Sequence, residues 1–131
     1  MDQFSISNFK DEAIKEYMRL TGQEKGSVTA LWHGLHQFLR MVALTEERQV
    51  APTPVDELWH TALKFTEDYR KFCLKAFGRM IHHMPATVPN KPSGYLITRK
   101  KAEEMYGALP PSIWPLEDRT DWSVGYLVEG E

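Results

Sequence analysis

The stretch from Pro52 to Pro85 reads PTPVDELWHTALKFTEDYRKFCLKAFGRMIHHMP, and the rest of the chain is organised around it. It holds the single cysteine of the protein and three of its five histidines. Histidine and cysteine side chains bind metals and carry acid–base or nucleophilic chemistry. This stretch is therefore the first place to look for a functional site.

Two helix-start signals lie inside this stretch. Thr53 is suited to cap a helix and Pro54 to occupy its first position, which predicts a helix over about 54–64. Thr66 is followed by two acidic residues, which is a second start signal and predicts another helix over about 67–77. We therefore expect two helices separated by a break, rather than one long helix.

Upstream of this stretch, apolar residues recur at helical spacing and predict helices over about 9–21 and 28–45. The second of these contains Gly34, an unfavourable residue in a helix interior, which suggests that another backbone approaches closely there.

Beyond Met84, closely spaced prolines predict an irregular segment. We expect a short helix over about 99–106 and a short strand pair formed by 95–97 or 126–128. Trp114 and Trp122 are too apolar for a disordered tail, so they are expected to be buried against the helices.

The predicted fold is all-α: a compact bundle of four or five helices with an irregular proline-rich C-terminal wrap. We expect one domain over 1–131, with a helical core at about 8–83 and the wrap, including its short helix, at 84–131.

Composition narrows the class of protein. The 131 residues carry a net charge of −2, which argues against nucleic acid as the default partner. A membrane span needs roughly 18 consecutive apolar residues, and the sequence has no such run. One cysteine excludes an intrachain disulfide and fits a reducing compartment. We expect a small soluble cytoplasmic domain with a protein partner.

The metal-ligand candidates are His60, Cys73 and His83, with His36 as the fourth ligand. A mixed sulfur and nitrogen set favours zinc. His82 and His83 are adjacent, so only one of the two is expected to join. His60 and Cys73 are thirteen positions apart, which on one straight helix is about 20 Å, so a shared site requires the predicted helix break.

Other interpretations of the same residues remain open. Cys73 lies among aromatic residues and fits a small core residue equally well. An enzyme would use Cys73 as nucleophile with His60 or His83 as base, but this needs an exposed thiol of lowered pKa. A plain protein-interaction module whose histidines and cysteine are structural is the third alternative.

Three elements of the stretch form a recognisable pattern: Val55-Asp56 followed by Trp59-His60, Tyr69 followed by Cys73, and Gly78-Arg79 followed by His82-His83. Over about residues 35–85 this pattern resembles the glycine-rich domain-containing protein-like family. The resemblance implies that Asp56, Trp59 and Tyr69 support a unit that includes His60, Cys73 and His83.

The chain departs from that family in two ways. Ala62 stands where relatives often have a second histidine, and the glycine-rich tail is absent, with only 8 glycines in the chain. A ligand found in some relatives is therefore missing, and the resemblance implies a site but no reaction.

Overall fold

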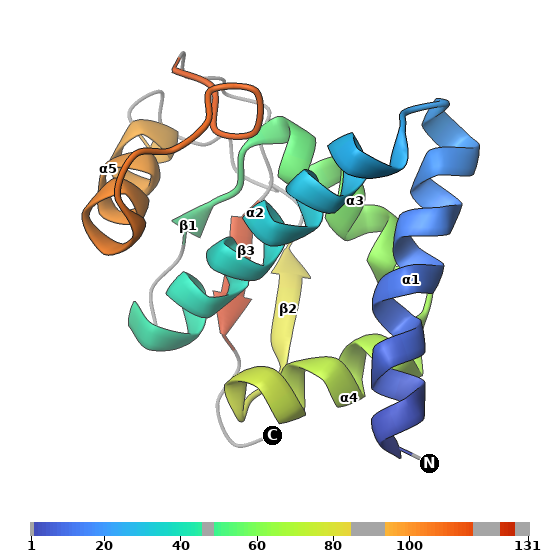
Figure 1. Cartoon of the computed structure of the whole chain (residues 1–131). Coiled ribbons are helices and arrows are strands. Elements are labelled where there is room, and N and C mark those ends of the chain that lie inside the picture. Colours follow the sequence, from blue (N-terminus) through green and yellow to red (C-terminus); the bar gives the residue numbers. More distant parts are fainter. Residues whose placement is uncertain (1, 46–48, 85–93, 117–123, 128–131) are drawn as a thin grey trace.

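The computed structural model describes residues 2–45, 49–84, 94–116 and 124–127. Five helices and three short strands follow one another in these residues (Figure 1). In chain order they are α1 (Asp2–Thr21), α2 (Lys25–Thr45), β1 (Gln49–Val50), α3 (Thr53–Leu63), α4 (Thr66–Phe77), β2 (Ile81–Met84), α5 (Gly94–Tyr106) and β3 (Val124–Leu127).

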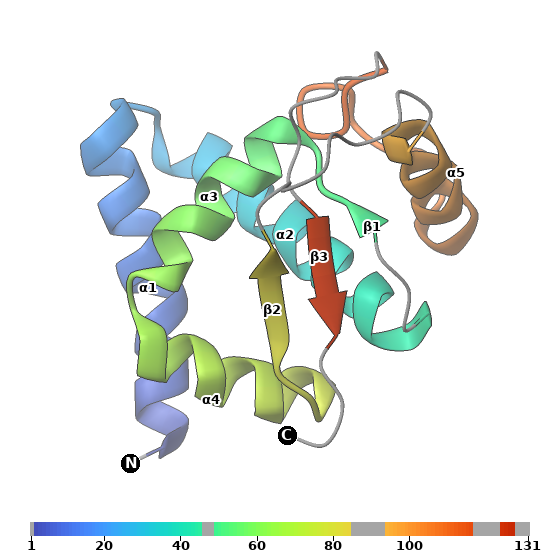
Figure 2. The ribbon, with the colours of Figure 1, turned by 180° about the vertical axis from the view of Figure 1, so that it is seen from behind.

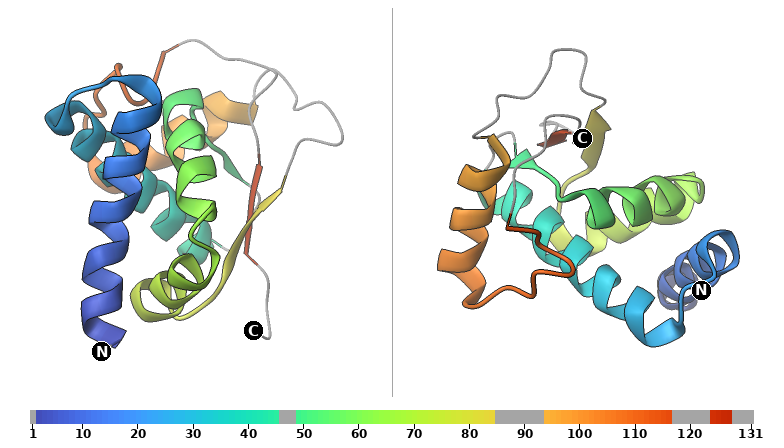
Figure 3. Two further views of the ribbon diagram at one scale, coloured as in Figure 1. Left: turned by 90° about the vertical axis from the view of Figure 1, so that its right-hand side faces the viewer. Right: turned by 90° about the horizontal axis from the view of Figure 1, so that it is seen from above.

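Helix α2 runs through the middle of the molecule. Its wide apolar stripe includes Leu35, Phe38 and Leu39, each at most 2% exposed, so the helix is covered on most of its surface. Figures 1 and 3 show α1 and α3 on one side of α2, and α5 on the side of α2 away from α1. The predicted bundle of four or five helices is confirmed, with five helices in the described residues.

The predicted break between α3 and α4 is confirmed. The backbone N–H groups of Lys64 and Phe65 bond to carbonyls three residues back, at 3.1 Å each, which tightens and ends α3. Phe65 then takes a non-helical conformation with ψ of 64°, and α4 begins at Thr66. Gly78, with φ of 75°, closes α4 in the left-handed conformation that favours glycine.

Three helices begin earlier than predicted. Helix α1 starts at Asp2 and α2 at Lys25, and α5 starts at Gly94 instead of about 99. The expected strand over 95–97 is wrong, because Tyr95, Thr98 and Ala102 are buried at helical spacing along α5.

The strands form one antiparallel sheet in the order β1-β3-β2, with β3 in the middle (Figure 2). The all-α prediction did not include this small sheet, although it allowed a strand near 126–128. Residues 124–127 form that strand, and Val128 lies outside the described residues. The sheet brings the C-terminal part of the chain beside β2, in front of α2 in Figure 2.

The C-terminal wrap is partly described. Trp114 is fully buried, as predicted, while Trp122 lies outside the described residues. The segment containing Ile113 and Trp114 lies against α2 at Gly34, where side chains, rather than a backbone, make the close approach. Within the described ranges, no helix is both long enough and apolar enough to span a membrane.

We expect Gly34→Ala to destabilise the protein. The new Cβ would lie 2.6 Å from Cγ2 of Ile113 and 3.2 Å from Cγ2 of Val55. Overpacking of this kind costs about 1–3 kcal/mol, against a gain of up to about 1 kcal/mol in helix propensity. Urea unfolding should show a lower free energy of unfolding.

Gly26→Ala is the matched control, because it lies in the same helix and its Cβ would meet nothing within 4 Å. It should leave the free energy of unfolding unchanged or raise it. Equal effects of the two substitutions would contradict the close approach at Gly34.

Candidate metal centre

Asp56, His60 and His83 bring three potential metal ligands together. One ligand atom from each residue lies within 4.8 Å of the other two. His83 Nε2 is 2.8 Å from Asp56 Oδ1, a hydrogen-bond distance, and His60 Nε2 is 3.7 Å from Asp56 Oδ2. The two imidazole rings lie side by side, with centroids 4.4 Å apart.

Two elements position these side chains. Asp56 and His60 are four residues apart on α3, so they lie on one face of the helix. His83 comes from β2, where side chains alternate between the two faces of the sheet. Ile81 and His83 share the inward face, which explains why His83 joins the group and His82 does not.

The group is buried at one end and open at the other. The side chains of Asp56 and His83 are 13% and 9% exposed, whereas that of His60 is 55% exposed. Ligands of a tetrahedral zinc ion are separated by about 3.3 Å, given metal–ligand distances near 2.0–2.1 Å. The observed spacings bracket this value, and His60 is free enough in solvent to adjust.

A buried hydrogen-bond chain supports His83 from behind. The indole N–H of Trp59 donates to the Tyr69 hydroxyl oxygen at 3.1 Å, and the Tyr69 O–H donates to the backbone carbonyl of Ile81. The Trp59 ring also packs edge-on against His83, with centroids 4.5 Å apart. Because Ile81 lies two residues before His83 on β2, this chain fixes the strand that carries the histidine.

Cys73 lies outside the Asp56–His60–His83 group. It is one turn after Tyr69 on α4, and its thiol interacts with the Tyr69 side chain and with the backbone of Ile81. The side chain is fully buried. Burial raises the pKa of Cys73, and the two hydrogen-bonding neighbours only partly oppose that rise.

His36 also lies outside the group. Its ring packs against Phe72 and Phe77 of α4, with centroid distances of 5.8 and 5.2 Å. Burial lowers the pKa of His36, and the nearby Arg40 lowers it further. His36, the expected fourth ligand, therefore packs against aromatic rings and does not join the other candidates.

Asp56, which the resemblance placed among the supporting residues, is itself a potential metal ligand. It contacts both histidines, one with each carboxylate oxygen. The signal was present in the sequence as the four-residue spacing of Asp56 and His60. Its approach to His83 depends on the sheet and has no local signal.

These features define a small helical domain with a compact Asp–His–His group between α3 and β2. The chain matches the UCP032817-like family model over residues 1–97 and belongs to that family, which is uncharacterised. Searches of curated proteins and of solved structures returned no significant match. The predicted membership of the glycine-rich domain-containing protein-like family is wrong, because the family model that matches is a different one.

We expect Tyr69→Phe to lower the free energy of unfolding by about 1–3 kcal/mol, because it leaves the buried Trp59 N–H and Ile81 carbonyl without this partner. Thermal and urea unfolding measure the change. Tyr106→Phe is the control: it removes a single bond to the Gln37 carbonyl at a half-buried position and should cost less. A smaller loss of unfolding free energy at Tyr69 than at Tyr106 would contradict the importance of the Trp59–Tyr69–Ile81 hydrogen bonds.

We expect the thiol of native Cys73 to react slowly with an aromatic disulfide reagent, because burial excludes the reagent and disfavours the thiolate. In protein unfolded in guanidinium, one thiol per chain should react rapidly, since the sequence contains a single cysteine. Comparable rates in the two states would show that the thiol is accessible and activated.

Proposed function

We propose that this protein is a metal-binding domain in which Asp56, His60 and His83 hold one divalent transition-metal ion, with zinc the first candidate. The observation that carries the proposal is the convergence of three ligand atoms within 4.8 Å from two separate elements. Exposed acidic side chains often lie close together on protein surfaces without binding a metal. Here, by contrast, Asp56 and His83 are largely buried beneath a solvent-exposed histidine.

The donor set consists of two imidazole nitrogens and one carboxylate oxygen. Such a set binds zinc at sites with three protein ligands and one open position, and it also binds ferrous iron. Zinc forms stronger complexes than ferrous iron or manganese with the same ligands. At equal metal concentrations, zinc is therefore expected to occupy the site. The sulfur of Cys73, which first suggested zinc, is not needed for this choice.

The open fourth position suits a binding or regulatory role. The exposed edge at His60 leaves room for a water molecule or for a donor from a protein partner. A Cys73-dependent enzyme is less well supported, because nucleophilic thiols require exposure and a lowered pKa. Burial gives Cys73 neither.

Metal titration tests the proposal. Chelator-treated protein should take up one zinc ion per chain in competition with a chromophoric chelator, and elemental analysis should give the same ratio. Asp56→Asn, His60→Ala and His83→Ala should each weaken binding at least about tenfold, because each removes a ligand. Zinc should also raise the melting temperature of the wild type.

Three further variants control for other donors. His33→Ala removes an exposed histidine of α2, His82→Ala removes the neighbour of His83, and Cys73→Ser removes the sulfur. All three should keep the wild-type zinc affinity. If no metal is taken up, or if Cys73→Ser weakens binding as much as His83→Ala, the proposed ligand set is incorrect.

A further inference from the structure

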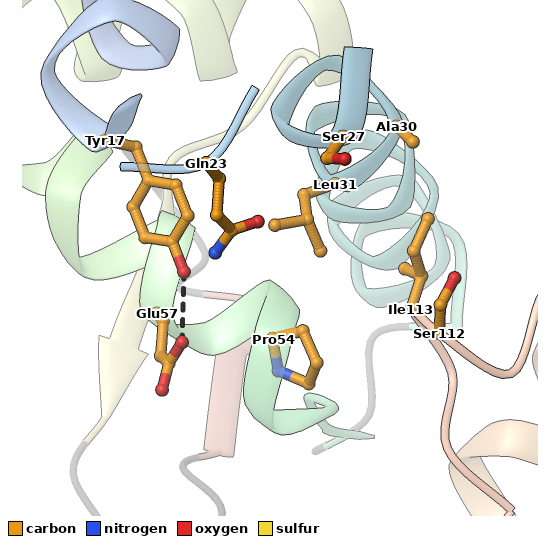
Figure 4. A pocket seen from close by; sticks show the side chains of 9 residues that line it. All are labelled: Tyr17, Gln23, Ser27, Ala30, Leu31, Pro54, Glu57, Ser112 and Ile113. Atoms are coloured by element: carbon orange, nitrogen blue, oxygen red, sulfur yellow. Dashed lines mark hydrogen bonds between the residues drawn. The ribbon is translucent and has the colours of Figure 1, made fainter. Parts of the chain in front are cut away.

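A cavity of about 470 Å³ lies between the end of α1, the first turns of α2 and α3, and the turn at 110–114 (Figure 4). Its volume is within the range of small-molecule sites in proteins. None of the residues in the Asp56–His60–His83 group lines it. It therefore belongs to a different part of the surface from the candidate metal centre.

One wall of the cavity is polar and organised. The Tyr17 O–H donates to Oε1 of Glu57 at 3.0 Å, joining α1 to α3 across forty positions of sequence. Burial raises the pKa of Tyr17 to about 12, and the Glu57 carboxylate adds to the rise, so the phenol stays neutral. The side chain of Gln23 lies beside Tyr17 and extends the wall (Figure 4).

The acceptors of this wall are available to a ligand. The bond from Tyr17 uses Oε1 of Glu57 and leaves Oε2 for another donor. Figure 4 shows the amide oxygen of Gln23 directed toward Leu31, across the space between α1 and α2, with the Ser27 hydroxyl beyond. Of the residues that the structure describes around the cavity, Glu57 is the only charged one.

The opposite wall is mainly apolar. It is formed by Ala30 and Leu31 of α2 and by Ile113, with Ser112 beside Ile113, while Pro54 lies next to Glu57 on α3 (Figure 4). An occupant therefore needs a hydrogen-bond donor at one end and a small apolar body at the other.

We infer that this cavity binds a small organic amine, with its protonated nitrogen at Glu57 and Gln23 and its apolar body against Leu31 and Ile113. An ammonium group supplies N–H donors for both acceptors, and its positive charge complements the Glu57 carboxylate. Among the described residues, no lysine, arginine or histidine lines the cavity to favour an anion. The inference does not depend on the proposed metal site.

The test uses three ligands of similar size and different charge: 2-phenylethylamine, neutral 2-phenylethanol and anionic phenylacetate. Each is titrated into the full-length protein while backbone amide signals are followed by NMR. The amine should give saturable shifts at Gln23, Ser27 and Glu57 and should bind more tightly than the other two. Glu57→Gln should weaken amine binding about tenfold and leave the alcohol unaffected.

Glu104→Gln is the matched control, because it removes an exposed carboxylate from α5 and changes the net charge equally. It should not alter amine binding, whereas Tyr17→Phe, which removes the bond that orients Glu57, should weaken it. The inference is overturned if phenylacetate binds as tightly as the amine, if the shifts map elsewhere, if no saturable shift occurs up to the solubility limit, or if Glu104→Gln and Glu57→Gln have equal effects.

Discussion

The hydroxyl of Tyr69 is the interaction on which the rest of the architecture depends. It accepts from Trp59 of α3 and donates to the backbone of Ile81 in β2, so three elements meet at one oxygen atom. This is possible only because the chain turns after Lys64. On an unbroken helix, Trp59 and Tyr69 would be about 15 Å apart along the axis. The break therefore allows the contact between Trp59 and Tyr69. Through the bond from Tyr69 to Ile81, it also fixes the position of His83, which lies two residues after Ile81.

Apolar periodicity predicted α1 and α2, and the start signals at Thr53-Pro54 and at Thr66 predicted α3 and α4. A capping side chain alone does not mark the start of a helix. Asn8 and Thr98 have the side chains of capping residues, yet both lie inside helices, because α1 begins at Asp2 and α5 at Gly94. At Thr98 the hydroxyl has another use: it accepts the Val50 N–H at 2.9 Å and donates to Gln49, joining α5 to β1. No local pattern reveals a bond across nearly fifty positions.

The sheet and the Asp56–His60–His83 group also depend on contacts between distant positions, which local sequence patterns do not reveal. β2 pairs with β3, which follows it by about forty positions, so the strand character of 81–84 depends on a distant partner. Once β2 is a strand, alternation separates His82 from His83 and brings His83 to Asp56. The sequence identified His60 and His83 as candidate ligands, and it made a site shared by His60 and Cys73 depend on the helix break. It could not indicate that Cys73, which shares a helical face with Tyr69, would turn toward the backbone of Ile81 and away from both imidazoles.

Helix α3 carries groups toward both proposed sites, and helical geometry explains how they stay separate. Asp56 and His60, four positions apart, share the face that meets β2. Glu57 is one position on, about 100° around the axis, and so meets Tyr17 of α1 instead. The other side of the helix carries Leu58 and Trp59, which are fully buried and hold the helix in the core. Because the backbone of α3 is anchored by that apolar face, substituting Glu57 changes the charge of the cavity without moving the ligands of the metal centre, and substituting His60 does the reverse.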